Sequence, residues 1–98
     1  MADTEKRMLK IKTGSVVRLN KELGLYETEK EAEAKRVAKM RDEGADAYDI
    51  KHAVSVLEEA KIMIPDTRQR LEGALQDLTG YVVGSLTYST ALRALPVL

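Results

Sequence analysis

The strongest constraint on the fold is a hydrophobic repeat that runs through a proline. Nine residues in the second half of the chain are spaced alternately four and three apart: Ile50, Val54, Leu57, Lys61, Ile64, Arg68, Leu71, Leu75 and Leu78. Seven of these nine are apolar, which is the a/d pattern of a helix that packs along one partner. Pro65 lies inside the repeat, although a proline normally ends or kinks a helix because it lacks an N–H. Since two separate helices would have no reason to share one repeat, we predict a single long helix that is kinked at Pro65.

The first half of the chain carries a matching repeat. Asp3 or Thr4 can cap a helix, and no proline follows before about Arg41. The alternate spacing of three and four continues through Leu9, Lys12, Val16, Leu19, Leu23, Tyr26, Lys30, Glu33, Val37 and Met40. We therefore predict a first helix about 55 Å long. Its packing should be loosest where Lys30 and Glu33 interrupt the apolar positions.

The two repeats are joined by a short turn at residues 42–48, DEGADAY. Gly44 can adopt the left-handed conformation that ends a helix, and Asp46 can cap the next one. Because so short a connection makes consecutive helices antiparallel, residues 1–78 are predicted to form an all-α, long antiparallel helical hairpin or coiled-coil bundle. Apolar residues also flank both repeats, so a third helix or a second copy is expected to cover the hairpin: Met8, Ile11, Val17, Ala53, Val56, Ala60, Met63 and Ala74.

The composition changes near Thr79. The chain has 16 acidic and 16 basic residues, and Arg93 is the only charged residue in the segment 79–98. The net charge of zero gives no whole-chain field that would favour nucleic acid or an anionic membrane. We expect residues 79–98 to be a divergent apolar tail, loosely packed or disordered; a YVV-GS-LTY hairpin and a helical turn over 91–95 are the alternatives. Its apolar side chains predict that the tail either folds back into the groove of the hairpin or drives self-association, with weak self-association as the preferred prediction.

The sequence offers no recognisable chemistry. Cysteine is absent and His52 is the single histidine, and no phosphate-binding, dinucleotide-binding or zinc-protease motif occurs. We therefore predict no catalytic, cofactor-binding or metal site, and no enzyme activity. The charged start, MADTEKRMLK, differs from a signal peptide, which favours a cytoplasmic protein.

Several segments resemble the tubulin-binding cofactor A (tubulin-specific chaperone A) family. They are KIKTG at 10–14, Tyr26-Glu27, KMRDEGADAYDIK at 39–51 and MIPDTRQRLEGALQDL at 63–78, in the family's order and spacing. The resemblance covers residues 8–78, and the turn followed by the IPD segment is its most specific part. After Leu78 the chain departs from the family pattern, so the family's third helix is not expected here.

The resemblance implies a fold and a function. Family members are rods of three helices, with the second helix kinked at its proline. They are non-enzymatic, cytoplasmic and cytoskeleton-associated chaperones that bind β-tubulin folding intermediates after the chaperonin and before heterodimer assembly. β-Tubulin and other tubulin-folding cofactors would be the partners, and binding would use helical surfaces. The expected partner-binding residues are Tyr48, Asp49, Pro65, Asp66, Arg68 and Arg70. The alternative is a coiled-coil interaction or dimerisation module that does not bind tubulin.

Overall fold

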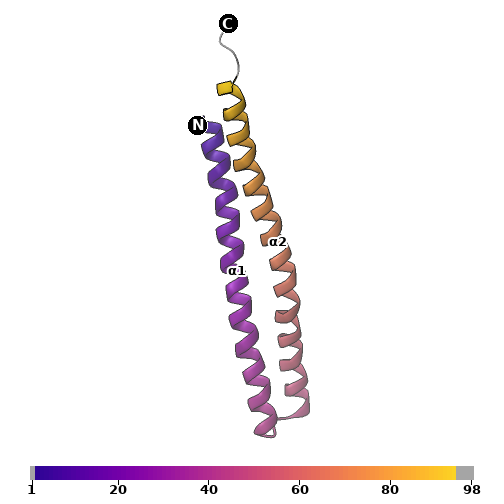
Figure 1. The fold of residues 1–98 in the computed structure, drawn as a ribbon. Helices are drawn as coiled ribbons and strands as arrows, with labels where there is room; N and C mark the ends of the chain where they lie inside the picture. The colour runs from indigo at the N-terminus through magenta and orange to yellow at the C-terminus, as the bar shows by residue number, and fades with distance from the viewer. Residues whose placement is uncertain (1, 95–98) are drawn as a thin grey trace.

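The computed structural model shows a long hairpin of two antiparallel helices (Figure 1). It describes residues 2–94, with side chains described as far as Leu86. Helix α1 spans Asp3–Asp42 and helix α2 spans Ala47–Ala94. The molecule measures 83 × 18 × 15 Å, which is the rod shape that the two repeats predicted. The all-α hairpin is therefore confirmed.

The first helix begins without a side-chain cap. Ala2 occupies the N-cap position, and its carbonyl accepts the Lys6 N–H at 3.0 Å. The prediction that Asp3 or Thr4 caps the helix is wrong, because Asp3 is already the first helical residue. Asp3 and Glu5 instead place negative charge in the first turn, where it interacts favourably with the helix dipole.

The turn forms as its residues predicted. Gly44 has a φ of 69°, and the N–H groups of Gly44 and Ala45 donate to the carbonyls of Arg41 (3.2 Å) and Met40 (2.9 Å). This is the Schellman arrangement, in which a left-handed glycine satisfies the last carbonyls of a helix. Asp46 then caps α2, since its carboxylate accepts the Tyr48 N–H at 3.1 Å. The reversal between the helices is thus encoded within a few residues.

The contact face of α1 agrees with the predicted one. Leu19 and Val37 are buried, and of the ten predicted positions only Lys30 is exposed. Val37 packs with Ala53 and Leu57 of α2 in a small cluster that Met40 and Val54 extend. Glu33 is partly buried on this face, so a carboxylate does interrupt the apolar contacts, as expected.

The contact face of α2 differs from the predicted one at alternate positions. Leu57 and Ile64 are buried, and Leu71 and Leu78 are partly buried, in agreement with the repeat. At three of the alternating positions of the repeat, however, the predicted contact is wrong, because the side chains are exposed: Lys61, Arg68 and Leu75. The residues that face α1 there come one position earlier and recur every seven residues: Ala53, Ala60, Thr67 and Ala74.

Small side chains explain this choice of face. Ala53 and Thr67 are each 2% exposed and Ala60 is 5% exposed. Side chains of this size allow two helices to approach closely, whereas lysine or arginine at these positions would have to lose the hydration of its charge. α2 is therefore rotated slightly about its axis relative to the predicted orientation. Its small side chains contact α1, and Lys61 and Arg68 remain in water.

Pro65 lies inside α2 and the helix continues through it, as predicted. The residue is exposed, so its ring is on the outer side of the hairpin and does not interfere with α1. The carbonyl that lacks its usual N–H partner because of the proline belongs to Lys61, which is exposed too, and water can satisfy it there. A kink of the axis at Pro65 stays a prediction.

The predicted end of the second helix near Leu78 is wrong, because α2 runs on to Ala94. Tyr81 and Ser85 extend the contact face beyond Leu78 at spacings of three and four, and both are partly buried. Residues 79–94 are helical, so the hairpin alternative for YVV-GS-LTY is also wrong, whereas loose packing of this segment stays a prediction. Residues 95–98 of the predicted tail lie outside the described residues. The division of the chain into units 1–78 and 79–98 stays a prediction.

Candidate functional site

Two of the predicted partner-binding residues lie at the turn. Tyr48 and Asp49 belong to the first turn of α2, and the Tyr48 side chain is 77% exposed. Together with Met40, His52 and other residues they border a shallow depression where the two helices meet. An exposed tyrosine beside a partly buried methionine offers an amphipathic contact, since the ring is apolar and its hydroxyl remains available for a hydrogen bond.

The other four predicted residues lie in the middle of α2. Pro65 is exposed, and the Asp66 carboxylate forms an ion pair with the Arg70 guanidinium at 3.3 Å. Arg68 pairs instead with Glu27 of α1 at 3.1 Å. Both ion pairs are largely exposed, so each contributes little to stability and leaves its arginine accessible to a partner.

The structure does not bring all six residues together. Sixteen residues of helix separate Asp49 from Pro65, which corresponds to about 24 Å along the axis. Arg68 and Arg70 are two residues apart and so project roughly 200° from each other around the helix. The six residues therefore form two patches along the rod, and the one at 65–70 extends around α2, with Arg68 and Arg70 on opposite sides. Any partner that touches both patches must lie along the length of the rod.

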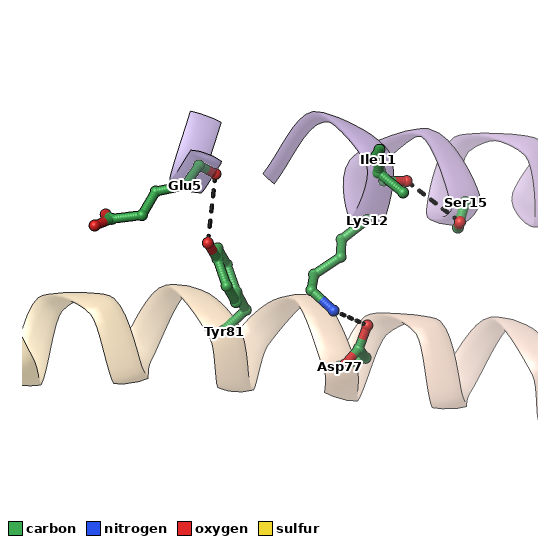
Figure 2. Close-up of polar contacts among 6 residues, drawn as sticks. All are labelled: Glu5, Ile11, Lys12, Ser15, Asp77 and Tyr81. Atoms are coloured by element: carbon green, nitrogen blue, oxygen red, sulfur yellow. Dashed lines mark hydrogen bonds and ion pairs between the residues drawn. The ribbon is translucent and has the colours of Figure 1, made fainter. Parts of the chain in front are cut away.

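A second set of polar contacts, which no sequence pattern predicts, joins the first turns of α1 to the C-terminal part of α2 (Figure 2). Lys12 donates to the Asp77 carboxylate at 2.7 Å, and its ammonium lies 5.4 Å from the centre of the Tyr81 ring. The Tyr81 hydroxyl donates to the Glu5 carbonyl at 3.5 Å, and the Ser85 hydroxyl lies 3.4 Å from the Glu5 carboxylate. These contacts attach the C-terminal part of α2 to the start of α1.

Large apolar side chains are exposed on both helices. Their exposed fractions range from 38% to 77%, and besides Tyr48 they are Ile11, Val17, Leu25, Ile62, Leu75, Val82, Val83 and Leu86. Exposed apolar side chains set among charged ones are characteristic of a surface that binds other proteins. Of the flanking residues predicted to need a cover, Ile11 and Val17 are exposed, whereas Ala53 and Ala60 are buried against α1.

The described part of the chain contains no cluster of three or more side chains suited to a metal ion. None of its helices has a stretch both long and apolar enough to cross a bilayer. The surface depressions within this part of the chain are open, and each is bordered by the exposed sides of one or both helices. The arrangement is suited to binding another macromolecule along the rod.

Comparison with known proteins gives a consistent answer. A family model described as tubulin binding cofactor A matches residues 4–90. Tubulin-folding cofactor A of Arabidopsis thaliana is 54% identical over 72 residues, which cover 74% of this chain and 64% of that relative. Tubulin-specific chaperone A of Homo sapiens is 47% identical over 78 residues, which cover 80% of this chain and 72% of the human protein. The match thus spans less than two thirds of the length of the Arabidopsis relative.

Solved structures resemble the hairpin as well. The crystal structure of tubulin folding cofactor A from Arabidopsis thaliana superposes with a TM-score of 0.77 at 47% identity, over 85% of this chain and 78% of that one. Human tubulin chaperone cofactor A superposes with a TM-score of 0.70 at 40% identity, over 89% and 84% of the two chains. The family match reaches residue 90, so it extends beyond residues 8–78, where the sequence motifs lie.

Proposed function

Because this chain belongs to the tubulin binding cofactor A family, we propose that it is a tubulin-folding chaperone that binds β-tubulin intermediates before heterodimer assembly. The observation that carries the proposal is the family match over residues 4–90, which includes almost all of both helices. The proposed action is binding without catalysis. Other tubulin-folding cofactors are proposed as further partners, and the cytoplasm, in association with the cytoskeleton, as the location.

The exposed surfaces of the rod support a binding role. A folding intermediate presents apolar surface that the assembled heterodimer would bury, and exposed side chains such as Tyr48 and Ile62 (77% and 66% exposed) can cover it reversibly. The rod is 83 Å long, so it can contact a large client at several points without enclosing it. Many modest contacts of this kind favour capture followed by release.

We propose that the two α2 patches, at Tyr48 and Asp49 and at 65–70, contact the client. Tyr48 supplies an aromatic anchor, and the exposed guanidinium groups of Arg68 and Arg70 can each pair with a client carboxylate. Arg68 would exchange its Glu27 partner for the client. Because that ion pair is exposed, the exchange costs little.

The experiment is capture of β-tubulin released from the chaperonin, followed as a shifted band on native gels. The wild-type chain should retain β-tubulin without α-tubulin. A Tyr48→Ala, Arg68→Glu double variant should lose about tenfold in apparent affinity if both anchors contribute. The matched control is Lys51→Glu, an exposed residue of the same helix outside both patches, which should bind like the wild type.

Two outcomes would overturn parts of the proposal. If the wild-type chain retains neither tubulin subunit, the chaperone role is wrong. The exposed apolar side chains Val83 and Leu86 (54% and 64% exposed) would then favour the alternative, a coiled-coil interaction or dimerisation module without tubulin binding. If tubulin is retained equally by all variants, the function stands but the assignment of the two patches fails.

A further inference from the structure

The outer face of the first half of α1 carries a depression that the hairpin does not use. Lys6, Leu9, Lys10, Thr13, Gly14, Val17, Arg18 and Lys21 border it. All of them belong to α1, and nearly all lie on the side of the helix away from its contact positions Lys12, Leu19 and Tyr26. Apart from its two neighbours in the chain and the backbone of the same helix, no heavy atom lies within 4 Å of the place where a Gly14 side chain would begin. The glycine therefore opens a gap in the side-chain surface of this face.

The rim of the depression is positively charged. Lys6, Lys10, Arg18 and Lys21 are all exposed, and no acidic side chain borders the gap. Among residues 2–86, whose side chains the structure describes, none of these four cations takes part in an ion pair, in contrast to Lys12, which pairs with Asp77. The apolar side chains of this face are Val17, which is 62% exposed three residues after Gly14, and the partly buried Leu9, which lies about two turns before Val17.

This arrangement is unfavourable for an isolated helix. Lys6 and Lys10 are four residues apart, and Arg18 and Lys21 three, so each pair places like charges next to one another on the helix surface. Gly14 in a helix interior is less favourable than alanine. A surface of this composition gains from a partner that supplies negative charge at the rim and one apolar side chain for the gap.

We propose that this face, residues 6–21 of α1, binds an acidic amphipathic helix of a protein partner. Fifteen residues separate Lys6 from Lys21, which corresponds to about 22 Å or four helical turns. A partner helix of that length places one apolar side chain over Gly14, against Val17. Its carboxylates then reach Lys6 and Lys10 at one end and Arg18 and Lys21 at the other, where charge-assisted hydrogen bonds can form.

The observations favour a protein helix over the other anionic partners. A membrane surface would require a broad apolar face, but only Leu9 and Val17 are large apolar side chains at this depression, and α2 covers the opposite side of α1. Single-stranded nucleic acid is usually held by aromatic side chains on which bases stack, and no aromatic residue borders the gap. The proposal does not depend on tubulin binding, because the face is separate from Tyr48, Asp49 and residues 65–70.

The test uses a fluorescein-labelled peptide of about 16 residues, designed as a helix with glutamates along two edges and one central leucine. Its binding to the full chain is followed by fluorescence anisotropy. The control peptide replaces every glutamate with glutamine. We expect saturable binding of the glutamate peptide that weakens as salt is added, and binding of the glutamine peptide at least about tenfold weaker.

Two variants locate the site. A Lys10→Glu, Lys21→Glu double variant should lose about tenfold or more in affinity, while the matched control Lys35→Glu, Lys51→Glu, with two exposed lysines outside the face, should change less than about twofold. Gly14→Met fills the gap without changing the charge, and the space at Gly14 allows it to fold. It should weaken peptide binding while leaving the circular dichroism spectrum and thermal stability of the chain intact or improved.

Equal binding of the two peptides, or equal affinity of all variants, would overturn the proposal. Vesicles containing phosphatidylserine and a single-stranded oligonucleotide serve as competing probes. If either binds more tightly than the glutamate peptide and loses affinity in the Lys10→Glu, Lys21→Glu variant, the face recognises that anion and the assignment to a protein helix is wrong.

Discussion

The two halves of the rod differ in packing. The turn half, residues 22–70, contains six of the seven buried residues among the described side chains: Val37, Ala53, Leu57, Ala60, Ile64 and Thr67. The open half, residues 2–21 and 71–94 with side chains described as far as Leu86, contains one such residue in its described part, Leu19. Of the nine large apolar side chains exposed within residues 2–86, six belong to the open half: Ile11, Val17, Leu75, Val82, Val83 and Leu86. Stability is therefore concentrated near the turn, and apolar surface available to partners is concentrated away from it.

Charge divides the same way. Residues 22–70 contain twelve acidic and nine basic residues, and the remainder of the chain contains four acidic and seven basic ones. The neutral total thus conceals a turn half of net charge −3 and an open half of +3. At physiological salt the Debye length is about 8 Å, far shorter than the 83 Å rod, so a partner experiences each half separately. A net charge near zero says little about binding when the charges of a long molecule are sorted along its axis.

The largest expected effect tests the packing difference directly. Leu57 in the turn half is buried, whereas Leu78, an equivalent position of the repeat in the open half, is only partly buried. Leu57→Ala should lower the free energy of unfolding by about 2–4 kcal/mol, and Leu78→Ala by roughly half as much. Urea denaturation followed by circular dichroism measures both. Equal losses would show that the two halves are packed equally well.

Replacing Glu33, in the turn half, is expected to increase stability. Its side chain is 19% exposed, its Oε2 lies 3.9 Å from the Arg36 guanidinium, and that oxygen has no hydrogen-bond partner among the described side chains. At 3.9 Å the two form an ion pair without a hydrogen bond. Glu33→Leu should therefore raise the free energy of unfolding by about 1 kcal/mol.

The control for Glu33→Leu is Glu31→Leu, at an exposed position nearby, which should stay within about 0.5 kcal/mol. Thermal unfolding of both variants compares them. If Glu33→Leu lowers the melting temperature, the carboxylate makes a favourable interaction and the turn half is more polar than its packing indicates.

The smallest expected effect is the difference in coupling energy between two interhelical ion pairs, one from each half. Lys12 pairs with Asp77 in the open half at 2.7 Å, with Lys12 only 18% exposed, while Arg68 pairs with Glu27 in the turn half with both side chains about half exposed or more. A double-mutant cycle to alanine should give a coupling of up to about 1 kcal/mol for the first pair and close to zero for the second. The first coupling should decrease in high salt. A larger coupling for Arg68 and Glu27 would reverse the ranking.

Most of the fold could be predicted from the sequence because its signals are local. The turn follows from Gly44 and Asp46, and the long helices follow from repeats that no competing pattern interrupts. The repeat alone predicts the wrong contact residues at alternate positions of α2, because it is defined by large apolar side chains and does not count alanine and threonine. The repeat assigns Lys61 and Arg68 to contact positions, although Ala60 and Thr67 directly precede them. Alanine and threonine are the better contact residues only because the two helices approach closely.

The extension of α2 was missed for a similar reason. Gly80, Gly84 and the β-branched residues around them are poor helix formers, so local propensity does not predict a helix here, although the spacing of Leu78, Tyr81 and Ser85 continues the contact face. Tertiary contact with Glu5 and Lys12 outweighs that local preference. A helix that ends at Leu78 would not carry Tyr81 and Ser85 along α1, so their polar contacts could not be predicted either. The candidate partner residues rest on family resemblance, and no pattern in the chain itself identifies them.

The small residues at every seventh position of α2 also leave the pairing of the helices degenerate. A shift of α2 along α1 by one repeat, about 10.5 Å, would exchange Ala53 for Ala60 and Leu57 for Ile64, and would bury similar side chains. The interface therefore does not by itself select one register. The turn does, because the left-handed Gly44 and the Asp46 cap fix where α2 begins. This short loop therefore sets the register of the two helices along the whole rod. The ion pair of Lys12 with Asp77, near the other end, forms only in that register.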